Sequence, residues 1–73
     1  MTLSNELIES FKNKPDQSKW NYILALQQLQ NAIFELEKDE NDPKVLKDLS
    51  RRALDIGKEL EELLTLMGTD LNE

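Results

Sequence analysis

The sequence DENDP, at residues 39–43, separates two long segments that carry the same apolar repeat. Proline disfavours helix in the residue before it, but it fits well as the first residue of a helix, and aspartate is a good N-cap. The stretch therefore predicts a turn over residues 39–42 and a new helix that begins at Pro43 with Asp42 as its N-cap. A connection this short allows only antiparallel neighbours.

Apolar residues on both sides of the turn recur at alternating steps of four and three, which is the heptad spacing of packed helices. The repeat predicts one helix over about 17–38 and a second over about 43–67, with Gly68 placed for a left-handed C-terminal cap. The expected layers of this hairpin pair Leu36 with Leu46, Ile33 with Leu49, Leu29 with Ala53, Leu26 with Ile56, and Tyr22 with Leu60.

A second proline, Pro15, predicts a break before the first long helix, with Asp16 as the N-cap. The residues before it, about 3–13, carry four apolar side chains on one side of a short helix that Thr2 or Ser4 would cap. A helix of this length rarely holds alone in water. We expect it to pack on the apolar end of the last helix, and we expect residues 69–73 to form a frayed tail.

The chain is thus predicted to be a single all-α domain, in which a short N-terminal helix precedes a long antiparallel helical hairpin. The composition agrees, because two Gly and two Pro in 73 residues are too few for a many-stranded sandwich. No apolar run approaches the ~18–20 residues needed to cross a bilayer, and the N-terminus lacks a signal-peptide pattern. A cytoplasmic protein that does not enter the membrane is expected.

The residue types that most enzymes need are missing. The absence of Cys and His excludes thiolate nucleophiles, imidazole bases and nearly every transition-metal site. The acidic turn lacks the twelve-residue pattern of a calcium loop, and Glu59, Glu61 and Glu62 have no histidine with which to form a di-metal site. We expect no catalytic residues, no cofactor and no metal.

Charge disfavours nucleic acid as a partner. Nine basic residues against fifteen acidic ones give a net charge of −6, which repels phosphate backbones and anionic membranes. A ladder of alternating charges along the last helix gives each basic residue a carboxylate one turn away, which is typical of a solvated face. Its members are Lys44, Asp48, Arg51, Asp55, Lys58 and Glu62.

Gly57 lies in the interior of the predicted last helix, beside Ile56 of the apolar repeat. A glycine inside a helix costs about 1 kcal/mol relative to alanine. We expect it to allow tight packing by the first helix or by a second hairpin, and a hinge or kink is the other interpretation.

Several large apolar residues fall outside the predicted seam, and a two-helix hairpin cannot bury both sets. A contiguous exposed group that includes Trp and Phe marks a contact surface. We expect a homodimer that closes a four-helix bundle, because hairpins of this size usually need a second copy to complete a core. Coverage by the short first helix and docking of a different protein stay open. The predicted interface residues are Trp20, Ile23, Leu24, Phe34, Leu54, Leu64 and Leu66.

The function expected from this pattern is that of a small non-catalytic adaptor or regulator that acts through protein–protein contact. The layout resembles that of small plasmid and phage regulators built from hairpin dimers. The alternative is a nucleic-acid-related regulator, either an acidic DNA mimic or an RNA-binding hairpin dimer. Mimicry would need carboxylates spread over one contiguous face, whereas here they are interleaved with Lys and Arg.

Overall fold

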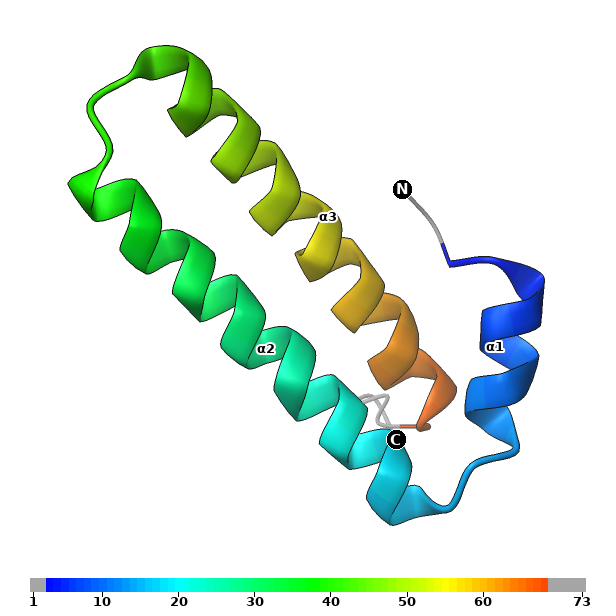
Figure 1. Cartoon of the computed structure of the whole chain (residues 1–73). Coiled ribbons are helices and arrows are strands. Elements are labelled where there is room, and N and C mark those ends of the chain that lie inside the picture. The colour runs from blue at the N-terminus through cyan, green and yellow to red at the C-terminus, as the bar shows by residue number, and fades with distance from the viewer. Residues whose placement is uncertain (1–2, 69–73) are drawn as a thin grey trace.

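The computed structural model describes residues 3–68, and these residues form three helices. They are α1 (Asn5–Lys12), α2 (Asp16–Asp39) and α3 (Pro43–Leu66). The two long helices lie antiparallel, and α1 packs at the end of the hairpin opposite the turn (Figure 1). The predictions of an all-α fold, a helical hairpin and a short preceding helix are confirmed. The predicted tail, residues 69–73, lies outside the described part of the chain.

Side-chain caps and the turn define the helix ends. The Ser4 hydroxyl accepts the Leu7 N–H at 3.1 Å and caps α1, and the Asp42 carboxylate accepts the Lys44 N–H at 2.9 Å and caps α3. Gly68 follows the C-cap of α3 with a φ of 73°, in the left-handed region that costs glycine little. These three positions agree with the sequence predictions.

Asp16 does not cap α2 as predicted. Pro15 occupies the N-cap position, with extended backbone angles, and its carbonyl accepts the Lys19 N–H at 3.1 Å. Asp16 is therefore the first helical residue, where its negative charge interacts favourably with the helix dipole. Its carboxylate lies 3.7 Å from the Lys19 ammonium.

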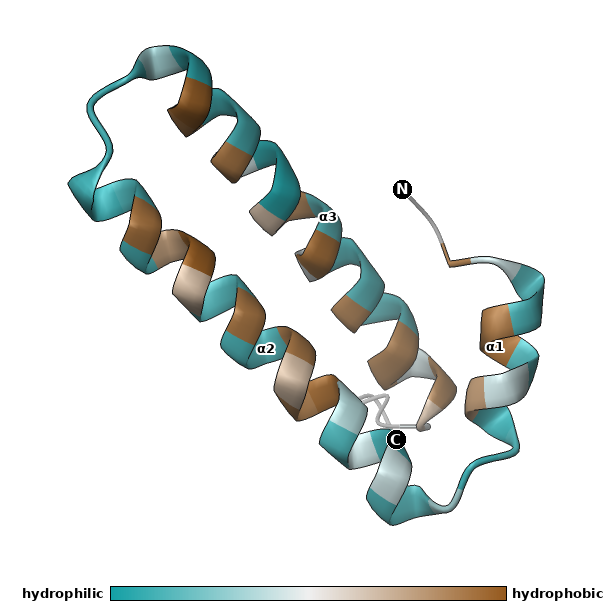
Figure 2. Cartoon of the chain, in the orientation of Figure 1, coloured by the Kyte–Doolittle hydropathy of each residue, from teal (hydrophilic) through white to brown (hydrophobic). Residues whose placement is uncertain are grey.

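The α3 side of the hairpin has the predicted seam. Ala53, Ile56 and Leu63 are buried, and Leu49, Leu60 and Met67 are partly buried against them. Hydrophobic residues line the sides of α2 and α3 that face each other (Figure 2). The buried residues form two clusters that share Leu26 and Leu60. One contains Ile33, Ala53 and Ile56, and the other contains Leu3, Phe11, Ile23 and Leu63.

The α2 side of the seam is rotated from the predicted one. Ile23 and Ile33 are buried, whereas Tyr22, Leu29 and Leu36 are exposed. The predicted layers that used these three exposed residues are therefore wrong. The residues that face α3 repeat at alternating steps of three and four, as Ile23, Leu26, Gln30, Ile33 and Glu37.

Two polar residues can occupy this seam because each finds a hydrogen-bond partner on α3. The Gln30 Nε2 group donates to the Ala53 carbonyl at 3.0 Å, and the Ser50 hydroxyl donates to the Glu37 carboxylate at 2.7 Å. A paired polar group costs little to bury partly. The small side chains of Ser50 and Ala53 also leave room for the longer Gln30 and Glu37.

Gly57 has a close neighbour within the hairpin itself, the α2 residue Gln30, whereas the sequence predicted packing by the first helix or by a second hairpin. A Cβ atom at this position would lie 3.1 Å from Gln30 Nε2, closer than an ordinary van der Waals contact. Gly57 therefore accommodates the amide that binds the Ala53 carbonyl.

The substitution Gly57→Ala tests this contact. Alanine gains about 1 kcal/mol in helix propensity, but its methyl group pushes the Gln30 amide away from Ala53. We expect Gly57→Ala to raise the free energy of unfolding by about 1 kcal/mol in a Gln30→Ala background and by clearly less in the wild-type chain. Urea unfolding of the four chains measures both values. An equal gain in both backgrounds would show that Gly57 and Gln30 do not interact.

Candidate protein-contact surface

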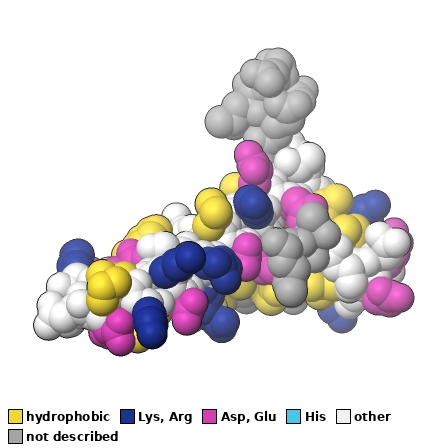
Figure 3. Space-filling model, turned by 90° about the horizontal axis from the view of Figure 1, so that it is seen from above, with side chains coloured by type: hydrophobic (Ala, Val, Ile, Leu, Met, Phe, Trp, Pro, Cys, Tyr) yellow, Lys and Arg dark blue, Asp and Glu magenta, His cyan; other side chains and the backbone are white. Residues whose placement is uncertain are grey.

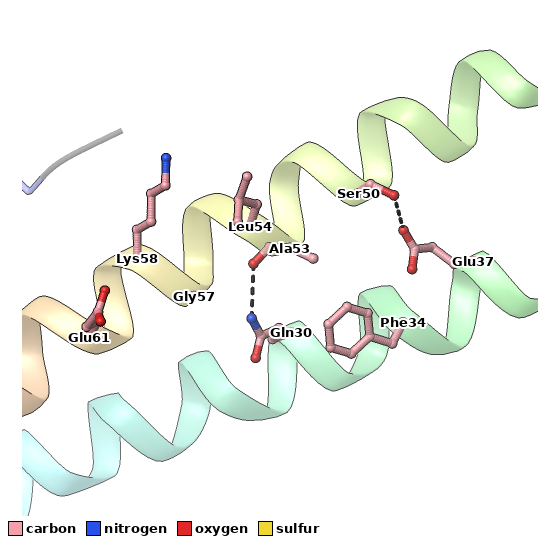
Figure 4. Close-up of a pocket in the computed structure, with 9 residues that line it drawn as sticks. All are labelled: Gln30, Phe34, Glu37, Ser50, Ala53, Leu54, Gly57, Lys58 and Glu61. Atoms are coloured by element: carbon pink, nitrogen blue, oxygen red, sulfur yellow. Dashed lines mark hydrogen bonds between the residues drawn. The ribbon is translucent and has the colours of Figure 1, made fainter.

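One flank of the hairpin carries two open hollows between α2 and α3. The larger, of about 540 Å³, lies near the middle of the hairpin, and Phe34 from α2 and Leu54 from α3 line it. Its floor contains the two hydrogen bonds that join Gln30 to Ala53 and Ser50 to Glu37 (Figure 4). The remaining residues that line this hollow are Gly57, Lys58 and Glu61.

The smaller hollow, of about 220 Å³, lies nearer the open end of the hairpin. Trp20, Leu24 and Gln27 line it from α2, and Leu60 and Leu64 line it from α3, with Ile23 beneath. In both helices the lining residues recur at steps of three, four or seven, which places them along one side. We call this flank the groove face, made up of Trp20, Leu24, Gln27, Gln30 and Phe34 on α2 and Ser50, Leu54, Gly57, Glu61 and Leu64 on α3.

The groove face exposes large apolar side chains. Leu54 is 59% exposed, Leu24 53%, Phe34 44%, Trp20 43% and Leu64 36%. Single exposed apolar residues are ordinary on a protein surface, but five on one flank, including the only Trp, form a patch. Such a patch is typical of a surface that another molecule covers.

Two of the predicted interface residues do not belong to this exposed patch. Ile23 is buried, because the rotation of α2 turns it inward against Phe11 and Leu63. Leu66 is partly buried on the flank of α3 that packs against the same cluster. The structure brings the other five predicted residues together on one face.

The short helix α1 packs against the opposite flank. Its Phe11 side chain is buried with Leu63, and the Phe11 ring lies 6.1 Å from the Tyr22 ring, centroid to centroid. Leu3, just before α1, is also buried and donates its N–H to the Glu62 carboxylate at 3.3 Å. Since Tyr22 and Glu62 point away from the groove face, α1 leaves the aromatic patch uncovered.

A second exposed apolar strip lies on the α1 side of the hairpin. Leu29, Leu36 and Val45 are 42%, 60% and 38% exposed there. This strip has no aromatic residue apart from Tyr22, and α1 projects from the same flank at one end. A flat partner surface would therefore meet α1 before it could lie along the whole strip.

Charged residues of both signs are mixed over the outer surface. Figure 3 shows Lys and Arg side chains next to Asp and Glu side chains on one side of the molecule. Three ion pairs between described residues join positions three apart on one helix, namely Lys12–Glu9, Lys19–Asp16 and Lys38–Glu35. Each involves an exposed carboxylate, so we expect about 0–1 kcal/mol from each.

Residues 3–68 contain no group of three or more acidic side chains arranged to hold a metal ion. Within the same range, none of the helices combines the length and hydrophobicity required for a membrane span.

Comparisons with protein-family models, with curated proteins and with solved structures gave no match for this chain.

The sequence did not indicate the polar floor of the larger hollow. Gln30 and Glu37 lie one and eight residues beyond Leu29 and are not members of the predicted seam. Their spacing of seven and fourteen residues from Ile23 is the signal that would have placed them between the helices.

Proposed function

We propose that this chain is a small non-catalytic protein that acts through protein–protein contact, and that the groove face is its contact surface. The observation that carries the proposal is the exposure of Trp20, Leu24, Phe34 and Leu54 on one flank, around two hollows. Aromatic residues beside hollows are typical of the anchors and pockets that dominate binding energy at protein interfaces.

The chemistry of the groove face agrees with a role in binding. Its polar groups are the amides of Gln27 and Gln30, the Ser50 hydroxyl, and the Lys58 ammonium and carboxylates at its edge, and the chain contains no His or Cys to act as a base or nucleophile. Gln30, Ser50 and Glu37 are already engaged in the hydrogen bonds that hold the hairpin together. An adaptor or regulator fits this inventory better than an enzyme.

Two leucines with the same exposure provide a matched test. Leu54 on the groove face is 59% exposed, and Leu36 on the opposite flank is 60% exposed. An aspartate at either position reaches water in the separate chain, so both Leu54→Asp and Leu36→Asp should fold. Only Leu54→Asp would place a charge in the proposed contact.

The experiment uses the wild-type chain and both variants as immobilised baits in an extract of the cells that make the protein. We expect proteins retained by the wild type to be retained by Leu36→Asp and lost with Leu54→Asp, as quantified by mass spectrometry. Far-UV circular dichroism checks that all three baits are equally helical. Equal retention by the three baits would contradict the proposal that the groove face makes the contact.

A further inference from the structure

We infer that the groove face is occupied by a second copy of this chain, in an antiparallel arrangement related by a two-fold axis that crosses the helices at Gln27. This inference rests on the proposed function and names the partner. In this arrangement α2 lies on the partner's α2 and α3 lies on the partner's α3, so that two hairpins form a four-helix bundle.

The spacing of the apolar residues on α2 is symmetric about Gln27. Trp20 lies seven residues before it and Phe34 lies seven residues after it. In an antiparallel pair of α2 helices centred on Gln27, Trp20 therefore meets the partner's Phe34, and Phe34 meets the partner's Trp20. Two aromatic pairs of this kind bury the largest exposed side chains of the groove face.

The apolar residues on α3 are symmetric about the same level of the hairpin. Gln30 contacts Ala53 and approaches Gly57, and Glu37 contacts Ser50. Together these pairs place Gln30 level with about residue 56 and Gln27 level with about residue 59. Leu54 and Leu64 lie five residues on either side of residue 59. One axis thus pairs Leu54 with the partner's Leu64 while it also pairs the aromatic residues of α2.

Charges at the edges of the groove face complement each other in this arrangement. Lys58 and Glu61 both line the larger hollow and lie on either side of the axis, so each lysine comes near the partner's Glu61 and also near the partner's Lys58. On α2, Lys38 and Asp16 lie eleven residues on either side of Gln27, and both are exposed in the single chain. Opposite charges therefore meet at both ends of the α2 pair, which favours this orientation.

The other way to stack two groove faces has its axis parallel to the helices. Each α2 would then lie on the partner's α3, at the same level along the hairpin. Since Glu37 is level with Ser50, Lys38 would lie beside the partner's Lys47. That like-charge contact disfavours the parallel axis.

Sedimentation equilibrium tests whether the partner is a second copy of the chain. We expect the wild type and Leu36→Asp to sediment with twice the 8.5 kDa mass of one chain. For Leu54→Asp we expect a dimer dissociation constant roughly 100-fold or more above that of the wild type. Circular dichroism checks helicity, and Leu54→Ser serves as a second variant that adds no charge. A wild-type mass of one chain at high concentration would overturn the inference. Dissociation by Leu36→Asp rather than Leu54→Asp would overturn it too.

Cysteine cross-linking tests the orientation, because the chain contains no native cysteine. Both Gln27 and its neighbour Gln28 are exposed, but only Gln27 lies at the proposed axis. We expect Gln27→Cys to form a covalent dimer under mild oxidation and Gln28→Cys to remain largely uncross-linked. Failure of Gln27→Cys to cross-link, or equal yields from both variants, would overturn the antiparallel arrangement.

A charge exchange provides an independent check of the same orientation. Lys58→Glu should weaken the dimer several-fold, because it places a second carboxylate beside the partner's Glu61. Adding Glu61→Lys should restore the affinity. No recovery in the double variant would contradict the edge contact. If the wild type is monomeric while the extract experiment still distinguishes Leu54→Asp from Leu36→Asp, the contact function stands and only the identity of the partner is wrong.

Discussion

Replacing Leu63 with alanine is expected to lower the free energy of unfolding by about 2–5 kcal/mol. Leu63 is fully buried, and its side chain joins all three helices through Leu3, Phe11 and Ile23. A chain of 73 residues has roughly 4–11 kcal/mol of stability in total. The loss should therefore remove a large share of the folded population, and urea unfolding followed by circular dichroism measures it.

The matched control for this substitution is Leu36→Ala, since Leu36 is exposed on the flank opposite the groove face. It should change the stability by less than about 0.5 kcal/mol. All chains are compared at one protein concentration, because self-association would add to the apparent stability. Similar losses for both leucines would contradict the burial of Leu63 at the junction of the helices.

The substitutions Ile23→Asp and Leu29→Asp are expected to have opposite outcomes. Ile23 is buried beside Phe11 and Leu63, so an aspartate there leaves a charge without a partner in an apolar cluster. We expect about 3–5 kcal/mol of destabilisation and loss of most of the helical signal. Leu29 is 42% exposed, and an aspartate there can reach water, so that chain should remain folded.

This pair of variants distinguishes the two possible faces of α2. Circular dichroism at neutral pH and urea unfolding provide the measurement. If Leu29→Asp unfolded while Ile23→Asp remained helical, the seam predicted from the sequence would be correct and the rotation of α2 would be wrong.

The helices and their order could be predicted because their signals are local. Pro43, with Asp42 before it, fixes the start of α3, and Gly68 fixes its end. The seam of α3 was also predictable, since an unbroken heptad stripe runs from Leu46 to Met67 and charged residues fill most of the other positions of the helix. Asp16 was misplaced because Pro15 itself takes the N-cap position, which needs only extended backbone angles.

The face of α2 could not be predicted from periodicity alone. Apolar residues lie on nearly every side of this helix, so at least two heptad seams can be drawn through it. The choice depends on partners in α3. Gln30 and Glu37 can lie in the seam because the Ala53 carbonyl accepts a hydrogen bond from Gln30 and the Ser50 hydroxyl donates one to Glu37. Contacts between residues so far apart in the sequence cannot be predicted from a local pattern.

The candidate surface was predictable in its aromatic part and not in its shape. Trp20, Leu24, Phe34 and Leu54 were expected to be exposed because they lie off the main seam, and they are. Ile23 was misassigned as a consequence of the rotation of α2. The larger hollow arises where the small residues Ser50, Ala53 and Gly57 face α2, and its position depends on the packing of the two helices.

Trp20 fluorescence measures whether a second copy of the chain covers the groove face. It is the only tryptophan of the chain and is 43% exposed in the single chain, so its emission reports burial of this face alone. We predict that emission of the wild type and Leu36→Asp shifts to longer wavelength on dilution, towards that of Leu54→Asp. Emission that is the same for all three chains at every concentration would contradict the account.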